Sequence, residues 1–141
     1  MHSELAHDLD ALRPWDRTTP GSGTKEILRR LLAVAGVMRG VPLELEGPLL
    51  AWRDEVNEVR WMKLCHGFLV GRSPGCTLVL KNRHISRCHL RFTETDQGFT
   101  VEDLKSSNGT KINGYPVEDK PRILISGDVI DCGGCGLVFV N

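Results

Sequence analysis

Three short polar clusters between residues 71 and 110 supply the side chains that a bound phosphate needs. They are Gly71-Arg72-Ser73, Arg83–His89 and Ser106–Thr110, and strand-like runs separate them. An arginine can make charge-assisted, bidentate hydrogen bonds to a phosphate, and short hydroxyl and amide donors can cover the remaining oxygens. The order and spacing of the clusters therefore indicate a phosphate-binding site.

The individual residues of these clusters admit both a binding role and a structural one. Arg72 follows Gly71 at a predicted strand end, where its guanidinium can reach a phosphate or form a surface ion pair. Ser86 offers a hydroxyl and a backbone N–H at a loop tip, or it can stabilise the turn. His89 has two ring nitrogens, which can hold two loops together. Residue spacing alone leaves these alternatives open.

The elements that must position the clusters are strands. From Trp61 onward, short apolar runs alternate with turn signals such as Ser73-Pro74-Gly75 and Gly127-Asp128. Many short strands with dense turns are typical of a β-sandwich or barrel rather than of a parallel α/β sheet. The predicted strands are Trp61–Cys65, Gly67–Gly71, Thr77–Leu80, His89–Thr93, Gly98–Asp103, Lys111–Ile112, Arg122–Ile125, Val129–Cys132 and Leu137–Val140.

Residues 1–58 are predicted to form an N-terminal arm with one or two short helices. A helix is expected from Thr24, as its N-cap, to Arg39, and a weaker one from Pro48 to Val59. Two helices this short do not make a stable domain, so they must pack on the C-terminal domain, on each other in a dimer, or on a partner. The apolar face of the first helix, with Arg30 off it, is Ile27, Leu28, Leu31, Leu32 and Ala35, and a shorter leucine stripe precedes it at Leu5, Leu9 and Leu12.

The composition excludes several classes of function. The chain has 141 residues and no net charge, which argues against non-specific binding to nucleic acid or to an anionic membrane. Its longest apolar run, Leu31–Met38, is far shorter than the about 20 residues that span a bilayer. Five cysteines without an export signal indicate reduced thiols, so we expect a cytoplasmic protein.

The pair Cys132-x-x-Cys135 has the spacing of half a zinc site. The other cysteines do not form a second pair at metal-ligand spacing, and a structural zinc needs four ligands. Predicted strands on both sides make Gly133-Gly134 a hairpin turn, with the cysteines as small strand residues. We therefore expect neither a metal nor a cofactor.

Five short motifs follow one another in the C-terminal part of the chain: Gly71-Arg72, Ser86-x-x-His89, Ser107-Asn108-Gly109-Thr110, Asn113-Gly114 and Gly127-Asp128. Taken together, they resemble the forkhead-associated (FHA) domain over residues 59–141. The resemblance implies an all-β sandwich of about eleven strands, whose loops at one end bind phosphothreonine in an extended peptide. It also implies a small apolar niche for the threonine methyl group, worth about 1 kcal/mol.

The resemblance assigns a role to each site residue. Asn108 would contact the peptide backbone through its amide, and Gly109 would adopt a positive φ. Asn113-Gly114 is predicted to form a structural turn, from which Asn113 can also brace the loop of Asn108. His89 would bridge backbone groups beneath the binding loops. The residues that would contact the phosphopeptide are Arg72, Ser86, Arg87, Ser107 and Asn108, and those that would support the site are Gly71, His89, Gly109, Thr110 and Asn113.

The leading hypothesis is a non-catalytic module that binds phosphothreonine in partner proteins and recruits them in Ser/Thr-kinase-dependent signalling or assembly. The alternative is a phospho-independent scaffold or oligomerisation module of a larger complex. An enzyme is the weakest interpretation, because no nucleophile–base pair or nucleotide loop stands out. Self-association through a phosphorylated Thr18, Thr19 or Thr24 of the N-terminal segment is a further hypothesis.

Overall fold

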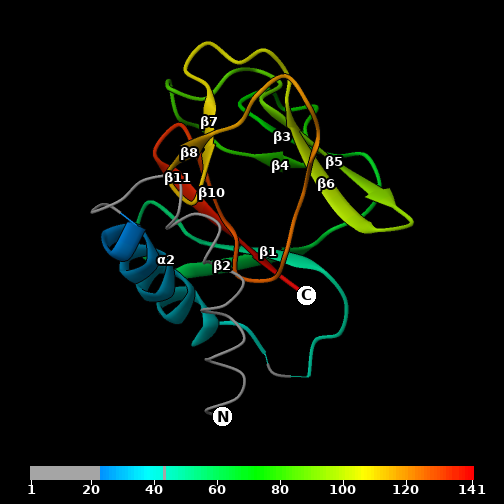
Figure 1. Ribbon diagram of the computed structural model, residues 1–141. Coiled ribbons are helices and arrows are strands. Elements are labelled where there is room, and N and C mark those ends of the chain that lie inside the picture. Colours follow the sequence, from blue (N-terminus) through cyan, green and yellow to red (C-terminus); the bar gives the residue numbers. More distant parts are fainter. Residues whose placement is uncertain (1–22, 43) are drawn as a thin grey trace.

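The computed structural model describes residues 23–42 and 44–141, in which one helix precedes eleven strands (Figure 1). The helix, α2, begins and ends one residue before its predicted bounds. The leucine stripe and the candidate phosphorylation sites Thr18 and Thr19 lie outside the described residues. The elements are α2 (Gly23–Met38), β1 (Leu49–Arg53), β2 (Val59–Lys63), β3 (Phe68–Gly71), β4 (Leu78–Val79), β5 (Leu90–Thr95), β6 (Gly98–Asp103), β7 (Thr110–Ile112), β8 (Tyr115–Pro116), β9 (Arg122–Ile123), β10 (Val129–Cys132) and β11 (Cys135–Val140).

The strands form two sheets, and the predicted β-sandwich is confirmed. One sheet has the order β2-β1-β11-β10-β7-β8, and the other has the order β4-β3-β5-β6-β9. Nearly all the neighbouring strands pair antiparallel; β3 and β4 are parallel. Side chains from the two inner faces fill the space between the sheets, as alternation along the strands requires.

The core lies between these two faces. In β5, Leu90 and Phe92 are fully buried while Arg91 between them is exposed, which is the period-two pattern of a strand with one solvated face. Phe92 meets Phe68 of β3 edge-to-face, with ring centroids 6.0 Å apart. Such pairs stabilise a core by about 0.5–1.5 kcal/mol beyond the area they bury.

The predicted helix over Pro48–Val59 is wrong, because this segment forms β1 and the start of β2. Strand β1 lies between β2 and β11. Leu50 and Trp52 face the core, while Leu49 and Ala51 on the other side pack beneath α2. A strand that is buried on both faces carries no polar alternation, so its apolar run resembles a helix in sequence. The sandwich therefore includes residues that the sequence analysis assigned to the N-terminal arm.

A tight turn separates β1 from β2. The carboxylate of Asp54 accepts hydrogen bonds from the backbone N–H groups of Val56 and Glu58, at 3.0 and 2.9 Å. Asn57 takes a left-handed conformation with φ of 64°, which asparagine tolerates better than most residues. These bonds end β1 and reverse the chain. The structure also contains β8, which was not predicted.

Helix α2 lies on the outer face of the sheet that contains β1 and β11 (Figure 1). Val37 packs with Val138 and Ala51 in a second apolar cluster. The predicted apolar face is wrong in part, because Leu28 and Leu32 are 57% and 63% exposed. The helix instead turns Val37 and the buried Arg30 toward the sandwich.

Arg30 fixes the rotation of the helix. Its Nε donates to the Gly127 carbonyl oxygen at 2.7 Å, and its Nη2 lies 3.1 Å from the Asp128 carboxylate. Both side chains of this ion pair are almost fully buried, so the pair compensates charges that water cannot reach. Helical spacing places Arg30 off the predicted apolar face, but in the fold Arg30 lies on the face that packs against the sandwich. No helix among the described residues is long and apolar enough to cross a bilayer.

Candidate functional site

Three loops at one end of the sandwich carry the predicted phosphate ligands, and hydrogen bonds hold them together. Arg72 N–H donates to the Ser86 carbonyl at 3.0 Å, which joins the β3–β4 loop to the β4–β5 loop. Ser107 N–H donates to the Ser86 hydroxyl oxygen at 3.0 Å, which joins the β6–β7 loop to the same point. The structure thus brings Arg72, Ser86 and Ser107 together although they lie far apart in the sequence.

Arg72 is an exposed side chain held at its base. Its Nε donates to the Ile85 carbonyl oxygen at 3.1 Å. Among the described residues, its two terminal nitrogens have no hydrogen bond and no carboxylate partner, so the alternative of a surface ion pair has no support here. The guanidinium is oriented by the β4–β5 loop and keeps its outer donors for an anion.

Gly71 lets the two loops approach each other. A Cβ atom at this position would lie 2.1 Å from the Arg87 carbonyl oxygen, closer than any van der Waals contact. The same oxygen accepts hydrogen bonds from Ser73 N–H at 3.0 Å and from the Cys76 thiol at 3.2 Å. The main chain of Arg87 is therefore tied to the β3–β4 loop, while its side chain is exposed.

Ser86 keeps one donor for a ligand, not the two expected from the sequence. Its backbone N–H is taken, because it donates to Nδ1 of His89 at 3.0 Å. Its hydroxyl oxygen accepts from Ser107, which leaves the hydroxyl hydrogen to donate elsewhere. The bond to Ser107 restricts the direction in which this hydrogen can point.

His89 is the buried support beneath these loops, as predicted. It is 0% exposed, and Nδ1 accepts from Ser86 while Nε2 lies 3.0 Å from the Gly109 carbonyl oxygen. A ring nitrogen that accepts an N–H carries no hydrogen, so Nε2 must be the protonated nitrogen and donates to Gly109. One neutral imidazole thus connects the β4–β5 loop to the β6–β7 loop.

Asp103, at the end of β6, is a second support that sequence reasoning missed. Its carboxylate accepts from Ser106 N–H at 2.9 Å, from the Ser106 hydroxyl at 2.6 Å and from the Thr110 hydroxyl at 2.7 Å. Burial alone would raise the pKa of Asp103, but the hydrogen bonds from Ser106 and Thr110 outweigh it and hold the pKa below its usual value. An aspartate three residues before a serine is the available signal, because this spacing favours a side-chain-to-backbone turn.

Asn108 and Gly109 form the exposed tip of the β6–β7 loop. The Asn108 amide donates to the His84 carbonyl oxygen at 2.9 Å, which leaves its oxygen and one amide hydrogen for a ligand. Gly109 has φ of 76°, so the predicted positive φ is confirmed. Thr110 is buried, and its hydroxyl donates a hydrogen bond to Asp103.

Asn113 and Gly114 form the predicted turn, between β7 and β8, with φ of 51° and 87°. The expected brace on the Asn108 loop is wrong, because the Asn113 side chain bonds elsewhere. The Asn113 amide donates to Asp128 at 3.0 Å, and its amide oxygen accepts from Val129 N–H at 2.8 Å. Asp128 is also the partner of Arg30. Asn113 follows the last residue of β7 and lies beside Asp128. It therefore holds the carboxylate that pairs with Arg30 of α2.

The β10–β11 turn is hydrogen-bonded to the β4–β5 loop. Cys132 and Cys135 are paired across the hairpin, with Gly133 and Gly134 between them at φ of 59° and 89°, as the hairpin prediction required. The Asn82 amide donates to the Gly133 carbonyl at 3.2 Å. Burial raises the pKa of Cys132 to about 12 and that of Cys135 to about 11, so both thiols stay protonated at neutral pH.

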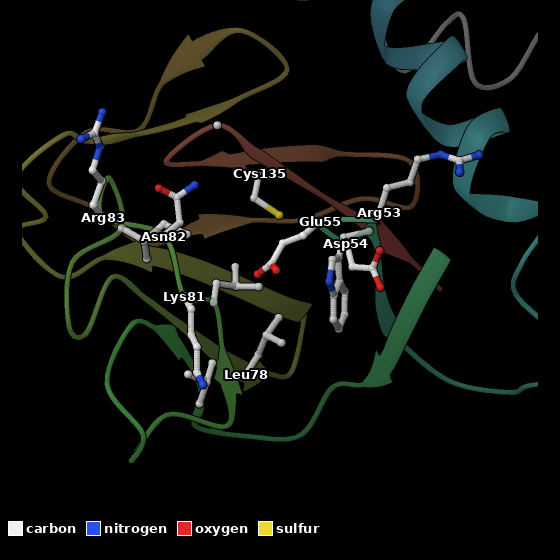
Figure 2. A pocket seen from close by; sticks show the side chains of 13 residues that line it. Arg53, Asp54, Glu55, Leu78, Lys81, Asn82, Arg83 and Cys135 are labelled. Carbon is white, nitrogen blue, oxygen red and sulfur yellow. The ribbon is translucent and has the colours of Figure 1, made fainter. Parts of the chain in front are cut away.

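A groove of about 670 Å³ lies beside the β4–β5 loop (Figure 2). Its lining combines apolar side chains, including Trp52 and Leu78, with charged ones that include Glu55 and Lys81. Arg53 reaches away toward α2, where it donates to a backbone carbonyl at 2.6 Å (Figure 2). The groove can accept an apolar side chain with a charged neighbour, and its lining includes Asn82 and Arg83 of the β4–β5 loop. Among the described residues, no group of three or more His, Cys, Asp or Glu side chains is placed to hold a metal ion.

Comparison with known proteins identifies the family. The family model described as FHA domain matches residues 68–133. An oxoglutarate dehydrogenase inhibitor of Corynebacterium diphtheriae is 37% identical over 71 residues, which are 50% of this chain and 48% of that protein. The chain spans about half of the length of the curated relatives it matches.

Solved structures of similar fold carry the same description. The FhaA FHA domain complexed with the intracellular domain of Rv3910 is 30% identical, with a TM-score of 0.58 over 66% of this chain and 99% of that chain. The MEK1 FHA domain in complex with the HOP1 pThr318 peptide is also 30% identical, with a TM-score of 0.54 over 68% of this chain and 97% of that chain. Both alignments cover nearly the whole of the solved domain.

Proposed function

The chain belongs to the FHA domain family, and from this premise we propose that it binds phosphothreonine in partner proteins without catalysing a reaction on them. One observation carries the proposal: Arg72 is fixed through Nε, keeps its outer nitrogens unpaired among the described residues, and is linked through the main chain to Ser86. A cation and a hydroxyl donor on hydrogen-bonded loops suit a phosphate dianion. The FHA domain of MEK1, which resembles this chain, was solved with a phosphothreonine peptide.

In the proposed complex, Arg72 binds the phosphate through its two terminal nitrogens. The Ser86 hydroxyl donates a further hydrogen bond, and Arg87 and the Ser107 hydroxyl complete the set. Asn108 holds the peptide backbone through its amide oxygen and its remaining amide hydrogen. The phosphate is bound mainly by charge-assisted hydrogen bonds, each worth about 1.5–3 kcal/mol.

We place this interaction in the cytoplasm, downstream of a Ser/Thr kinase, because such kinases produce the phosphothreonine that the site would bind. The partner is a phosphothreonine-containing protein, recruited by the module in signalling or assembly. In this function the module does not hydrolyse the bound phosphothreonine. Release of inorganic phosphate from a bound peptide by the purified protein, lost in Arg72→Ala, would contradict it.

A second function, phospho-independent assembly through α2, has one observation in its favour. Leu28 and Leu32 lie one turn apart and remain largely exposed on the helix. Self-association through a phosphorylated Thr18, Thr19 or Thr24 is a separate route to the same outcome. Light scattering of the full chain before and after kinase treatment distinguishes a monomer, an oligomer that forms without phosphorylation and an oligomer that forms only after it. A constant monomer mass excludes both forms of self-association.

An oriented peptide library tests the main proposal. The full chain is immobilised and offered three matched libraries, with phosphothreonine, phosphoserine or unmodified threonine at the fixed position. We expect enrichment from the phosphothreonine library and the strongest selection at positions close to the phosphate. Equal recovery from all three libraries would contradict phosphothreonine binding and favour the scaffold function.

A further inference from the structure

Two cysteines connect the phosphate-site loops. Cys76 belongs to the β3–β4 loop, four residues after Arg72, and Cys88 belongs to the β4–β5 loop, directly after Arg87. The Cys88 thiol lies close enough to Cys76 to contribute to the raised pKa of the Cys76 thiol. The Cys76 thiol also donates to the carbonyl oxygen of Arg87 at 3.2 Å. Both cysteines are free thiols in this structure.

The two thiols differ in accessibility in the way that stepwise oxidation requires. Cys88 is exposed, so a small disulfide in solution can reach it. Cys76 is 8% exposed, and its thiol is held against the carbonyl group of Arg87, which is bonded directly to Cys88. Thiol–disulfide exchange needs one sulfur open to attack and a second within reach to displace the leaving thiol.

We propose that Cys76 and Cys88 are a reversible disulfide site that cross-links the two loops of the phosphate site. The oxidant is a low-molecular-weight disulfide such as glutathione disulfide. The Cys88 thiolate attacks one sulfur of the oxidant, which forms a mixed disulfide and releases one thiol. Cys76 then loses its proton to solvent and attacks Cys88 Sγ, which forms the internal bond and releases the second thiol. Two protein thiols are oxidised, and one small disulfide is reduced to two thiols.

The second step is the slow one at neutral pH. Burial raises the pKa of the Cys76 thiol, and the negative charge of a Cys88 thiolate beside it adds to the rise. Capping of Cys88 as a mixed disulfide removes that charge. Because only the thiolate attacks, closure of the internal disulfide should become faster as the pH rises toward the pKa of Cys76.

The bond would change the geometry of the site. A Cβ at Gly71 would lie 3.0 Å from Cys76 Sγ, which shows that the buried sulfur is closely confined on that side. Cys88 must therefore move toward Cys76 to close a bond of about 2.05 Å. Cys88 lies between Arg87 and His89, and His89 orients Ser86. We expect the oxidised protein to bind a phosphopeptide at least five-fold more weakly than the reduced protein, a consequence that rests on the proposed function.

The other paired cysteines provide an internal comparison. Cys132 and Cys135 face each other across the β10–β11 hairpin, but burial raises their pKa values to about 12 and 11. Cys132 is fully buried. They should therefore oxidise far more slowly than the pair at Cys76 and Cys88. Cys65 is exposed and serves as the control for an accessible thiol.

The test uses the full chain, incubated with glutathione disulfide at pH 8 and then alkylated, digested and mapped by mass spectrometry. We expect a linkage of the Cys76 and Cys88 peptides that dithiothreitol reverses. Cys65→Ser should leave this linkage intact, and Cys88→Ser should abolish it. Linkage only at Cys132–Cys135, or stable glutathionylation of Cys88 without closure, would overturn the proposal.

Calorimetry on the same samples separates this proposal from the proposed function. The probe is a phosphothreonine peptide selected from the library. A reduced protein that does not bind it refutes the proposed function, while the mapped linkage still supports the disulfide site. A reduced protein that binds, together with an oxidised protein of equal affinity, overturns the inferred effect of the bond on the site. Weaker binding by the oxidised protein, restored by dithiothreitol, supports it.

Discussion

The hydroxyl oxygen of Ser86 accepts a hydrogen bond from the backbone N–H of Ser107 at 3.0 Å. This bond connects two of the loops that carry the site. Because Ser107 occupies one lone pair of the Ser86 oxygen, the Ser86 hydroxyl hydrogen points in another direction. The backbone N–H of Ser86 is meanwhile fixed on His89. A single serine therefore sets the spacing of the loops and offers one oriented donor to a ligand.

Replacement of this serine should affect binding more than folding. Ser86→Ala removes one hydrogen bond to a charged phosphate, so we expect a loss of affinity of about 10- to 100-fold. The free energy of unfolding should fall by only about 1 kcal/mol, because the lost Ser107 contact is exposed. Isothermal titration calorimetry and urea unfolding measure the two effects. Ser126→Ala is the control, since Ser126 makes a similar hydrogen bond to Asn141 at 3.1 Å outside the site loops.

His89→Ala, in contrast, should strongly lower the stability of the fold. The variant leaves the Ser86 N–H and the Gly109 carbonyl without their partner and opens a cavity, so we expect the free energy of unfolding to fall by about 3 kcal/mol. The matched control is His66→Ala, because exposed His66 also accepts a backbone N–H, at 3.2 Å. A similar small loss in both variants would show that His89 is not a structural bridge.

The carboxylate of Asp103 should make the fold sensitive to acid. Its pKa is lowered in the folded protein, so the stability it contributes is fully present above its unfolded pKa of about 3.9 and is lost as the pH falls through the folded value. We expect Asp103→Asn to lower stability at pH 7 and to flatten the decline below pH 4. Urea midpoints at pH 7, 4 and 3 measure the slope, with exposed Asp96→Asn as the control. An unchanged slope in Asp103→Asn would contradict this role.

Helix α2 should contribute to the free energy of unfolding of the domain. Arg30→Ala leaves a buried Asp128 without its cation, and breaking a buried pair in this way costs about 3–5 kcal/mol. Urea unfolding measures the loss, and Arg39→Ala, at an exposed position just beyond the helix, is the control. If Arg30→Ala unfolds at the same urea concentration as the wild type, the helix is only loosely attached.

The parts of the fold that sequence patterns predicted are those with local signals. Strands β6 and β10 match their predicted bounds because turn residues flank them. Strand β1 was missed because it is covered on both faces and lacks alternation. Arg30 was misplaced because its partner Gly127 lies 97 residues away in the sequence, and no local pattern reports such a contact.

The site divides in the same way. Residue type and order suffice to propose Arg72, Ser86 and Asn108, because a phosphopeptide site demands those donors, and their contacts with a peptide stay a prediction. The bond of Ser86 N–H to His89 and the role of Asp103 could not be predicted in this way, because both depend on how two loops meet in space. Asn113 was assigned to the wrong neighbour for the same reason.

The most direct test of phosphate binding is a calorimetric titration of the Arg72→Ala variant with a selected phosphothreonine peptide. Arg91→Ala is the matched control, because Arg91 is an exposed arginine that pairs with Glu102 on the sheet at 2.6 Å. Loss of two charge-assisted hydrogen bonds predicts at least about 100-fold weaker binding by Arg72→Ala, and wild-type affinity in Arg91→Ala. Binding by Arg72→Ala within three-fold of the wild type would contradict the account.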